Sequence, residues 1–370
     1  MNGILETLSG MKTGGRRLIG CFPLYPPLEL LHSFGLTPIT LWGMRDAVRD
    51  YGTGDRHVQN YACQVARALT GFVIDNGPSL FDALFMYNAC DTLRNLPEIV
   101  HAGIRETGAD LPIFRLHVPA LSPDRTGAKD YLRDRLRLLM ADLERFTGRP
   151  FSAKAFAESA ALYAKQRSFC REIEALCTGG KMPFAAAAPL LERAHFMDVR
   201  EHIALLEEAV THHAGLPENG SGVRVLVSGI QAPPVDLLRV MDASGLTVAA
   251  NDIATMARSY GTSPTGSDLL DYYAAFYFDH HPCTTILPAG DRRIKLLGQR
   301  VQEDGIRGVV FFGEKFCEYE YFEIPYLQET LNTRGVATLF LELGADDLAN
   351  LMPLRTRIEA FAEIVRGDSV

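Results

Sequence analysis

Short apolar runs alternate with helical periodicities along this chain. Six of these runs are expected to form buried strands: 18–21, 84–87, 113–116, 225–228, 309–312 and 338–341. Short apolar strands separated by helices are typical of parallel sheets that are covered on both faces. The pattern therefore predicts an α/β fold.

Two segments repeat the same order of elements. The first strand is followed by Pro26-Pro27-Leu28-Glu29-Leu30-Leu31 and then by Gly35-Leu36-Thr37, and the fourth by Pro233-Pro234-Val235-Asp236-Leu237-Leu238 and then by Gly245-Leu246-Thr247. A proline at the first turn and a glycine after the last turn are helix boundary signals. We interpret the repeat as two duplicated Rossmann-like domains, although any two α/β units share some of this likeness.

Between the two halves the periodicity becomes helical. Leu132, Leu136, Leu139 and Leu143 recur at spacings of three and four, and Gly148 ends the pattern. We expect a helical insert here, joined to the second half by a linker at 217–222. The predicted division is 1–124 for the first α/β domain, 125–216 for the helical insert, 217–352 for the second α/β domain and 353–370 for a closing helix.

An aromatic segment interrupts the second half. Residues 259–288 include Tyr272, Tyr273, Phe276 and Tyr277. A connection of this length is usually functional, so the segment is a candidate for contacts to a ligand.

Composition narrows the function classes. The chain has 370 residues, with 37 Lys and Arg against 45 Asp and Glu, for a formal charge of −8. The acidic balance argues against nucleic acid as a partner, and no apolar run approaches the roughly 18 residues that a membrane span needs. Because no signal-peptide pattern precedes Arg17, we expect a cytoplasmic protein without a membrane partner.

Several familiar catalytic motifs are absent from the sequence. It contains no Gly-x-Gly-x-x-Gly after a strand, no phosphate-binding loop and no Gly-x-Ser-x-Gly. The pairs His212-His213 and His280-His281 lack a second cluster at zinc-ligand spacing. We interpret them as helix-end and loop residues.

Seven cysteines in a cytoplasmic chain are expected to be reduced, either buried or bound to a metal. Cys170 and Cys177 lie seven residues apart in a helical stretch, which favours burial on one face. Cys90 and Cys317 instead occupy equivalent places, each after an apolar strand and before an acidic residue. A thiol at a helix start readily becomes a thiolate ligand. The spacing leaves metal binding and simple packing equally open, and it assigns no role to Cys21 or Cys283.

Three segments around cysteines resemble the cluster-binding segments of a known family. They are Tyr61-Ala62-Cys63-Gln64-Val65-Ala66-Arg67, Asn88-Ala89-Cys90-Asp91-Thr92-Leu93-Arg94 and Lys315-Phe316-Cys317-Glu318. The family comprises the subunits of 2-hydroxyacyl-CoA dehydratases and benzoyl-CoA reductases, including the D-component of 2-hydroxyglutaryl-CoA dehydratase. Pro27–Leu30 and Gly335–Glu342 resemble it too, whereas Gln64 stands where the family commonly has proline.

The resemblance implies an iron–sulfur subunit in which Cys63, Cys90 and Cys317 hold a [4Fe-4S] cluster. It also implies a homologous partner subunit in a heterodimer, with a homodimer as the alternative. An ATP-hydrolysing activator protein would deliver one electron of low potential. That electron would reach the thioester carbonyl of an acyl-CoA substrate and form a ketyl radical, which leads to dehydration or to ring reduction. Asp91 and Glu318 would lower the potential of the cluster if they point inward, or they are solvated acids at helix starts.

Glu29 matches the Pro-x-Glu-Leu segment of the family and is our candidate for acid/base chemistry or substrate positioning. The alternative is that an acid in the first helical turn contributes about 0.3–1 kcal/mol to stability, as Asp236 in the matching place suggests. Two other function classes remain open. One is an electron relay or a larger-cluster reductase of small molecules, and the other is a cluster-free α/β scaffold.

Overall fold

The computed structural model describes residues 2–48, 50–121, 124–218, 222–286, 291–344, 347 and 349–367. Its strands form two four-stranded sheets, ordered β2-β1-β3-β4 and β6-β5-β7-β8, and all neighbouring strands are parallel. The strands are β1 (Arg17–Cys21), β2 (Leu36–Thr40), β3 (Ala83–Tyr87), β4 (Ile113–Leu116), β5 (Val223–Gly229), β6 (Leu246–Ile253), β7 (Gly308–Glu314) and β8 (Ala337–Leu343). The predicted α/β class and all six predicted strands are confirmed.

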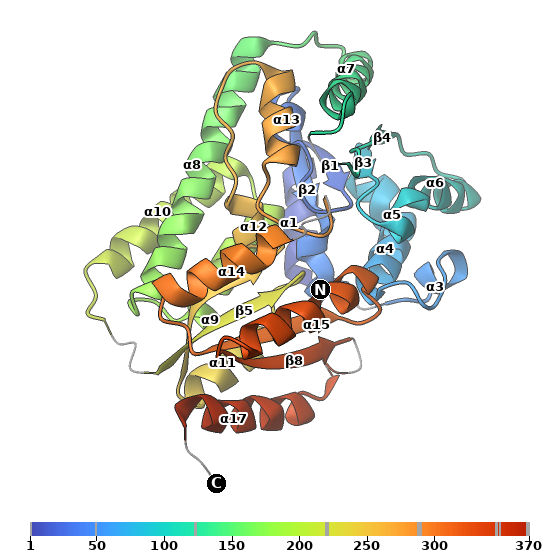
Figure 1. Ribbon diagram of the computed structural model, residues 1–370. Coiled ribbons are helices and arrows are strands. Elements are labelled where there is room, and N and C mark those ends of the chain that lie inside the picture. The colour runs from blue at the N-terminus through green and yellow to red at the C-terminus, as the bar shows by residue number, and fades with distance from the viewer. Residues whose placement is uncertain are drawn as a thin grey trace. The chain divides into compact units, whose positions relative to one another are not determined.

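Helices connect the strands (Figure 1), and in sequence a helical region lies between the last strand of the first sheet and the first strand of the second. The α-helices are α1 (Asn2–Thr13), α2 (Leu28–Ser33), α3 (Gly54–His57), α4 (Gln64–Leu80), α5 (Asp91–Arg94), α6 (Leu96–Glu106), α7 (Ala128–Thr147), α8 (Ala153–Thr178), α9 (Phe184–Glu192), α10 (Val199–Ala214), α11 (Val235–Ala243), α12 (Ala257–Tyr260), α13 (Leu269–Phe278), α14 (Asp291–Glu303), α15 (Glu318–Asn332) and α17 (Met352–Arg366). The helical region between the sheets, α7 to α10, is confirmed. Of the predicted linker, residues 219–221 lie outside the described residues, as do residues 287 and 288 of the aromatic segment.

The chain divides into two compact units that exchange segments. The first unit contains Met1–Lys165, Ala194–Arg200 and Thr262–Pro288, and the second contains Gln166–Arg193, Glu201–Gly261 and Ala289–Val370. The helical region is thus shared between the units. Most of the aromatic segment belongs to the first unit although it follows β6 of the second sheet in sequence.

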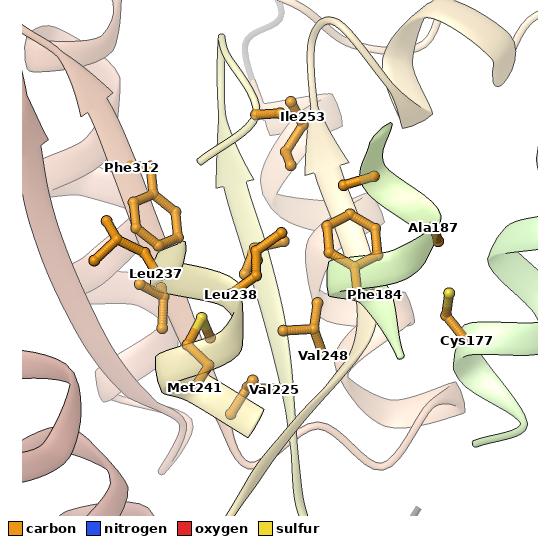
Figure 2. Close-up of a cluster of buried hydrophobic side chains, with 14 of the residues drawn as sticks. Cys177, Phe184, Ala187, Val225, Leu237, Leu238, Met241, Val248, Ile253 and Phe312 are labelled. Atoms are coloured by element: carbon orange, nitrogen blue, oxygen red, sulfur yellow. The ribbon is translucent and has the colours of Figure 1, made fainter. Parts of the chain in front are cut away.

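Alternating side chains of the second sheet form two separate cores. Val225 and Phe312 belong to the core on the α11 and α17 face, part of which Figure 2 shows, whereas Leu226 and Phe311 belong to the core under α14 and α15. This alternation is the two-residue period of a strand that is buried on both faces. It explains why these strands appear in the sequence as unbroken apolar runs.

The order of the strands marks one position in each sheet where a ligand site is expected. In the first sheet β2 lies on one side of β1, and the next strand, β3, lies on the other side. In the second sheet β6 and β7 flank β5 in the same way, so the strand order reverses between β1 and β3 and between β5 and β7. Open α/β sheets bind ligands at such switch points, outside the carboxyl ends of the strands. The loops after β1, β3, β5 and β7 are therefore the expected locations of functional side chains.

Among the helices that the structure describes, none combines the length and apolar character that crossing a bilayer requires.

Candidate functional site

All three cysteines of the family-like segments occupy the same structural position. Cys63, Cys90 and Cys317 are the N-cap residues of α4, α5 and α15, and none of their side chains makes the capping hydrogen bond. The N–H groups of a first helical turn point toward such a position and favour a negative charge there. This environment suits thiolates that hold a metal cluster.

The loop before Cys63 is held by Arg67. The guanidinium of Arg67 donates to both carboxylate oxygens of Asp55 in α3, each at 2.7 Å, and to the carbonyl oxygen of Asn60 at 3.2 Å. The backbones of α3 and α4 also touch, because a Cβ at Gly54 would lie 2.0 Å from the Arg67 carbonyl oxygen. These contacts therefore hold the loop and the first turn of α4 on either side of Cys63.

Cys90 lies at the switch point of the first sheet, three residues after β3. The Asn88 side chain braces its loop by accepting from the Val118 N–H at 2.8 Å and donating to the Val118 carbonyl at 3.0 Å. Asp91, the next residue, has a side chain that is 76% exposed and pairs with Arg94 at 2.7 Å. Asp91 is thus a solvated acid at a helix start.

Cys317 lies at the switch point of the second sheet, after β7. Its N–H donates to the Glu314 carbonyl at 2.9 Å, and the N–H of Lys315 donates to the Leu343 carbonyl at the end of β8 at 3.0 Å. Phe316 between them has a φ of 65°. A non-glycine residue in this left-handed region costs about 1–3 kcal/mol, and such strain is concentrated at functional sites.

Three of the other cysteines are buried thiols with a raised pKa. Cys170 and Cys177 are buried in α8, as predicted, and burial raises the pKa of the Cys170 thiol to about 12 and that of Cys177 further. Burial likewise raises the pKa of Cys21 at the end of β1. Burial therefore favours the protonated form of these three thiols.

The aromatic segment contacts Tyr25 in the loop after β1. Tyr25 has a φ of 63°, and its hydroxyl donates to the Cys283 Sγ at 3.3 Å. Its carbonyl accepts from the Tyr277 hydroxyl at 3.1 Å, and its ring lies 4.3 Å from the ring of His280. Cys283 and His280 thus both contact Tyr25 in the loop that follows the first strand, which we could not derive from the sequence.

Glu29 is buried beneath two tyrosines of α13. Its side chain is 1% exposed, and its two carboxylate oxygens accept hydrogen bonds from the Tyr272 hydroxyl at 3.0 Å and the Tyr273 hydroxyl at 2.9 Å. The Tyr273 oxygen also accepts from the Leu30 N–H at 2.9 Å. Burial, followed by the charge of Glu29, raises the pKa of Tyr273 well above its ordinary value, so this hydroxyl stays protonated as a donor.

The corresponding edge of the second sheet carries a buried charge network. Asp252 at the end of β6 accepts from Ser228 at 2.8 Å, from Arg258 at 3.0 Å and from Arg293 at 2.8 Å. Arg293 also pairs with Glu323 of α15. The network ties α12, α14 and α15 to the carboxyl ends of the strands.

Nowhere among the described residues do three or more His, Cys, Asp or Glu side chains gather as a metal-binding group. Cys63 and Cys90 belong to the first unit and Cys317 to the second, so the ligand set expected from the sequence draws on both units. His212 and His213 lie in the last turn of α10 and His281 follows α13, as predicted.

Comparison with known proteins identifies the class of this chain. Residues 23–365 match the family model for the D-component of 2-hydroxyglutaryl-CoA dehydratase. The chain belongs to this family.

Three relatives extend over nearly the full length. The beta subunit of (R)-phenyllactyl-CoA dehydratase from Clostridium sporogenes is 22% identical over 95% of this chain and 93% of its own length. The beta subunit of (R)-2-hydroxyglutaryl-CoA dehydratase from Acidaminococcus fermentans is 26% identical over 96% and 94%. A benzoyl-CoA reductase subunit from Thauera aromatica is 24% identical over 95% and 91%. All three relatives are subunits of acyl-CoA dehydratases or reductases.

Proposed function

We propose that this chain is the iron–sulfur subunit of an acyl-CoA dehydratase or aromatic acyl-CoA reductase that depends on an ATP-hydrolysing activator. Cys63, Cys90 and Cys317 would hold a [4Fe-4S] cluster. When bound, such a cluster would supply one electron of low potential to an acyl-CoA thioester. The chain would act with a homologous partner subunit, because its relatives are named as subunits.

One observation carries the proposal beyond family membership. Cys63, Cys90 and Cys317, which the family-like segments single out, are the cysteines at helix N-cap positions. The donor set therefore fits a cluster that needs thiolates.

Glu29 is proposed as the acid/base or substrate-positioning group. Each carboxylate oxygen of Glu29 accepts a hydrogen bond from one tyrosine hydroxyl, and these two bonds fix the orientation of the carboxylate. In this role Glu29 would hold or take up a proton at the loop after β1.

The cysteine assignment is tested by iron and sulfide analysis of protein prepared without oxygen. Cys63→Ala, Cys90→Ala and Cys317→Ala should each lose cluster iron and the visible thiolate-to-iron absorption. The matched controls Cys170→Ala and Cys177→Ala should keep the iron of the wild-type protein. Full iron content in Cys317→Ala would refute a cluster held by both units, and an iron-free wild-type protein would favour the scaffold alternative.

Substrate binding separates the enzyme from an electron relay. Calorimetric titration with 2-hydroxyacyl-CoA and aromatic acyl-CoA esters should show saturable binding to the cluster-loaded protein with its partner subunit. Turnover should occur only when the activator and ATP are present. An intact, reducible cluster with no affinity for any ester would favour the relay.

A further inference from the structure

Helix α15 has apolar residues on two opposite faces. Ile324, Leu327 and Leu331 are buried against the second sheet and α14. The opposite face carries Tyr319, Phe322 and Tyr326, which follow one another at spacings of three and four and are therefore neighbours on the helix surface. Phe322 is 84% exposed.

We call the exposed side chains Phe316, Tyr319, Phe322 and Tyr326 the aromatic face of α15; their exposed fractions are 44%, 37%, 84% and 47%. Single exposed apolar residues are common, whereas a contiguous exposed apolar surface marks an interaction site. Aromatic residues in particular are enriched at the centres of protein interfaces. The second apolar face of this helix is therefore a candidate docking surface.

Acidic groups lie along the α15 part of the aromatic face, whereas at its other end the Lys315 Nζ lies 6.0 Å from the centre of the Phe316 ring. The exposed charged residues within α15, Glu318 and Glu329, are both acidic, and the helix contains no Lys or Arg. Tyr326 at the edge of the face donates a hydrogen bond to Asp291 at 3.1 Å. Aromatic rings bordered by carboxylates complement a surface that presents arginine and lysine around apolar side chains, because guanidinium groups both stack on rings and pair with carboxylates.

We propose that the aromatic face of α15 is the docking surface for the partner subunit, and that the partner presents a basic, arginine-bearing apolar patch to it. This inference rests on the proposed function, which supplies the partner. Cys317 is the N-cap of the same helix, and the strained Phe316 joins the docking surface to it. Docking would therefore cover the helix whose first turn presents a proposed cluster ligand.

The test uses the chain produced together with the proposed homologous partner subunit. Phe322→Glu should weaken the complex by at least about 30-fold, the loss typical of a central aromatic residue in an interface. The matched control is Ile364→Glu on α17, since Ile364 is 68% exposed and lies outside the aromatic face. Both variants should keep the melting temperature of the unassembled wild-type chain, which separates lost docking from lost folding.

Crosslinking identifies the occupant directly. A photo-reactive phenylalanine analogue placed at 322 should crosslink to the partner subunit, and the same analogue at 364 should not. Crosslinks from 322 to a second copy of this chain, or only within the same chain, would overturn the stated occupant. A complex that forms with wild-type affinity in Phe322→Glu would overturn the surface while leaving the proposed function intact, whereas failure of the wild-type chain to form any complex would also contradict the proposed function.

The charge argument has its own measurement. Glu318→Gln combined with Glu329→Gln should slow association several-fold and flatten its dependence on salt, because these acids would steer a basic partner. An unchanged association rate with an unchanged salt dependence would overturn the assigned chemistry of the partner.

Discussion

Helices α2 and α11 start from nearly the same sequence and reach opposite environments. Each follows a Pro-Pro pair, and each carries an acid at its second position, Glu29 or Asp236, with a basic residue three positions later, His32 or Arg239. Asp236 and Arg239 pair with each other at 3.2 Å on the surface, with side chains 72% and 71% exposed. Glu29 is instead buried against two tyrosines, and His32 bonds to Ser159 at 2.7 Å.

The difference shows that the local motif determines the helix but not the role of its charged residues. In both helices the acid lies in the first turn, where its negative charge interacts favourably with the helix dipole. Only in the first unit do α8 and α13 supply partners for the acid and the base, from positions more than 120 residues away in sequence.

The carboxyl ends of the strands differ in charge between the two sheets. The paired residues Cys21 and Thr40 at the ends of β1 and β2 are uncharged, whereas the equivalent pair in the second sheet is Ser228 and Asp252. Each unit thus buries a carboxylate near the carboxyl ends of its strands, Glu29 in the first unit and Asp252 in the second. The first unit uses tyrosine hydroxyls to satisfy it, and the second uses two arginines.

The largest effect should come from removing the carboxylate of the second unit. Asp252→Asn leaves Arg258 and Arg293 buried without their shared counter-ion, and loss of one partner of a buried ion pair costs about 3–5 kcal/mol. Hydrogen exchange of β5 and β6 should quicken accordingly. The control is Thr40→Val at the equivalent register position, which should cost about 1 kcal/mol or less. Equal effects would contradict a charge network specific to the second unit.

The direct comparison of Glu29 with Asp236 should give a smaller difference. Glu29→Ala deprives two buried hydroxyls of a charged acceptor, so we expect the first unit to lose about 3 kcal/mol of unfolding free energy. Asp236→Ala removes an exposed ion pair and should change stability by less than about 0.5 kcal/mol. Denaturant titration followed by a probe in each unit measures both.

A result in which both alanine variants cost the same would break the comparison. Glu29→Gln refines it, because the amide keeps one acceptor oxygen but replaces the other by a donor that faces a hydroxyl. Its cost should fall between those of the two alanine variants. Any loss of turnover in Glu29→Gln beyond its loss of stability would support the proposed chemical role.

The architecture could be predicted from the sequence because its signals are local. The apolar runs, the Pro-started helices and the glycine stops each act within a few residues, and β1 to β8 follow them. The N-cap placement of Cys90 and Cys317 was predictable for the same reason, since each stands between an apolar run and an acidic residue. Cys63 was identified only by resemblance, because no strand directly precedes it.

The environment of Glu29 could not be predicted from its neighbours. It depends on Tyr272 and Tyr273, which follow β6 in sequence but fold with the first unit. No periodicity within 259–288 indicates that exchange, and only the density of aromatic residues marked the segment. The contact between Cys283 and the Tyr25 hydroxyl could not be predicted for the same reason.

The smallest effect concerns the basic residues of α2 and α11. Burial, and after it the charge of Arg200, lower the pKa of His32 below its ordinary 6.5. The unfolded chain therefore binds a proton more tightly than the folded one, and stability that is complete at pH 7 is lost as the pH falls below about 6.5. Arg239 stays charged throughout this range, so it contributes no such dependence.

His32→Asn should accordingly flatten the fall of unfolding free energy between about pH 7 and pH 5, because the asparagine amide can still donate to Ser159 but does not titrate. Arg239→Gln should leave that slope unchanged while it removes the surface ion pair with Asp236. Thermal unfolding of both variants and of the wild-type chain across this range measures the two slopes. A steeper slope in His32→Asn would mean that the folded chain holds the His32 proton more tightly than the unfolded chain, which would contradict a pKa lowered by burial.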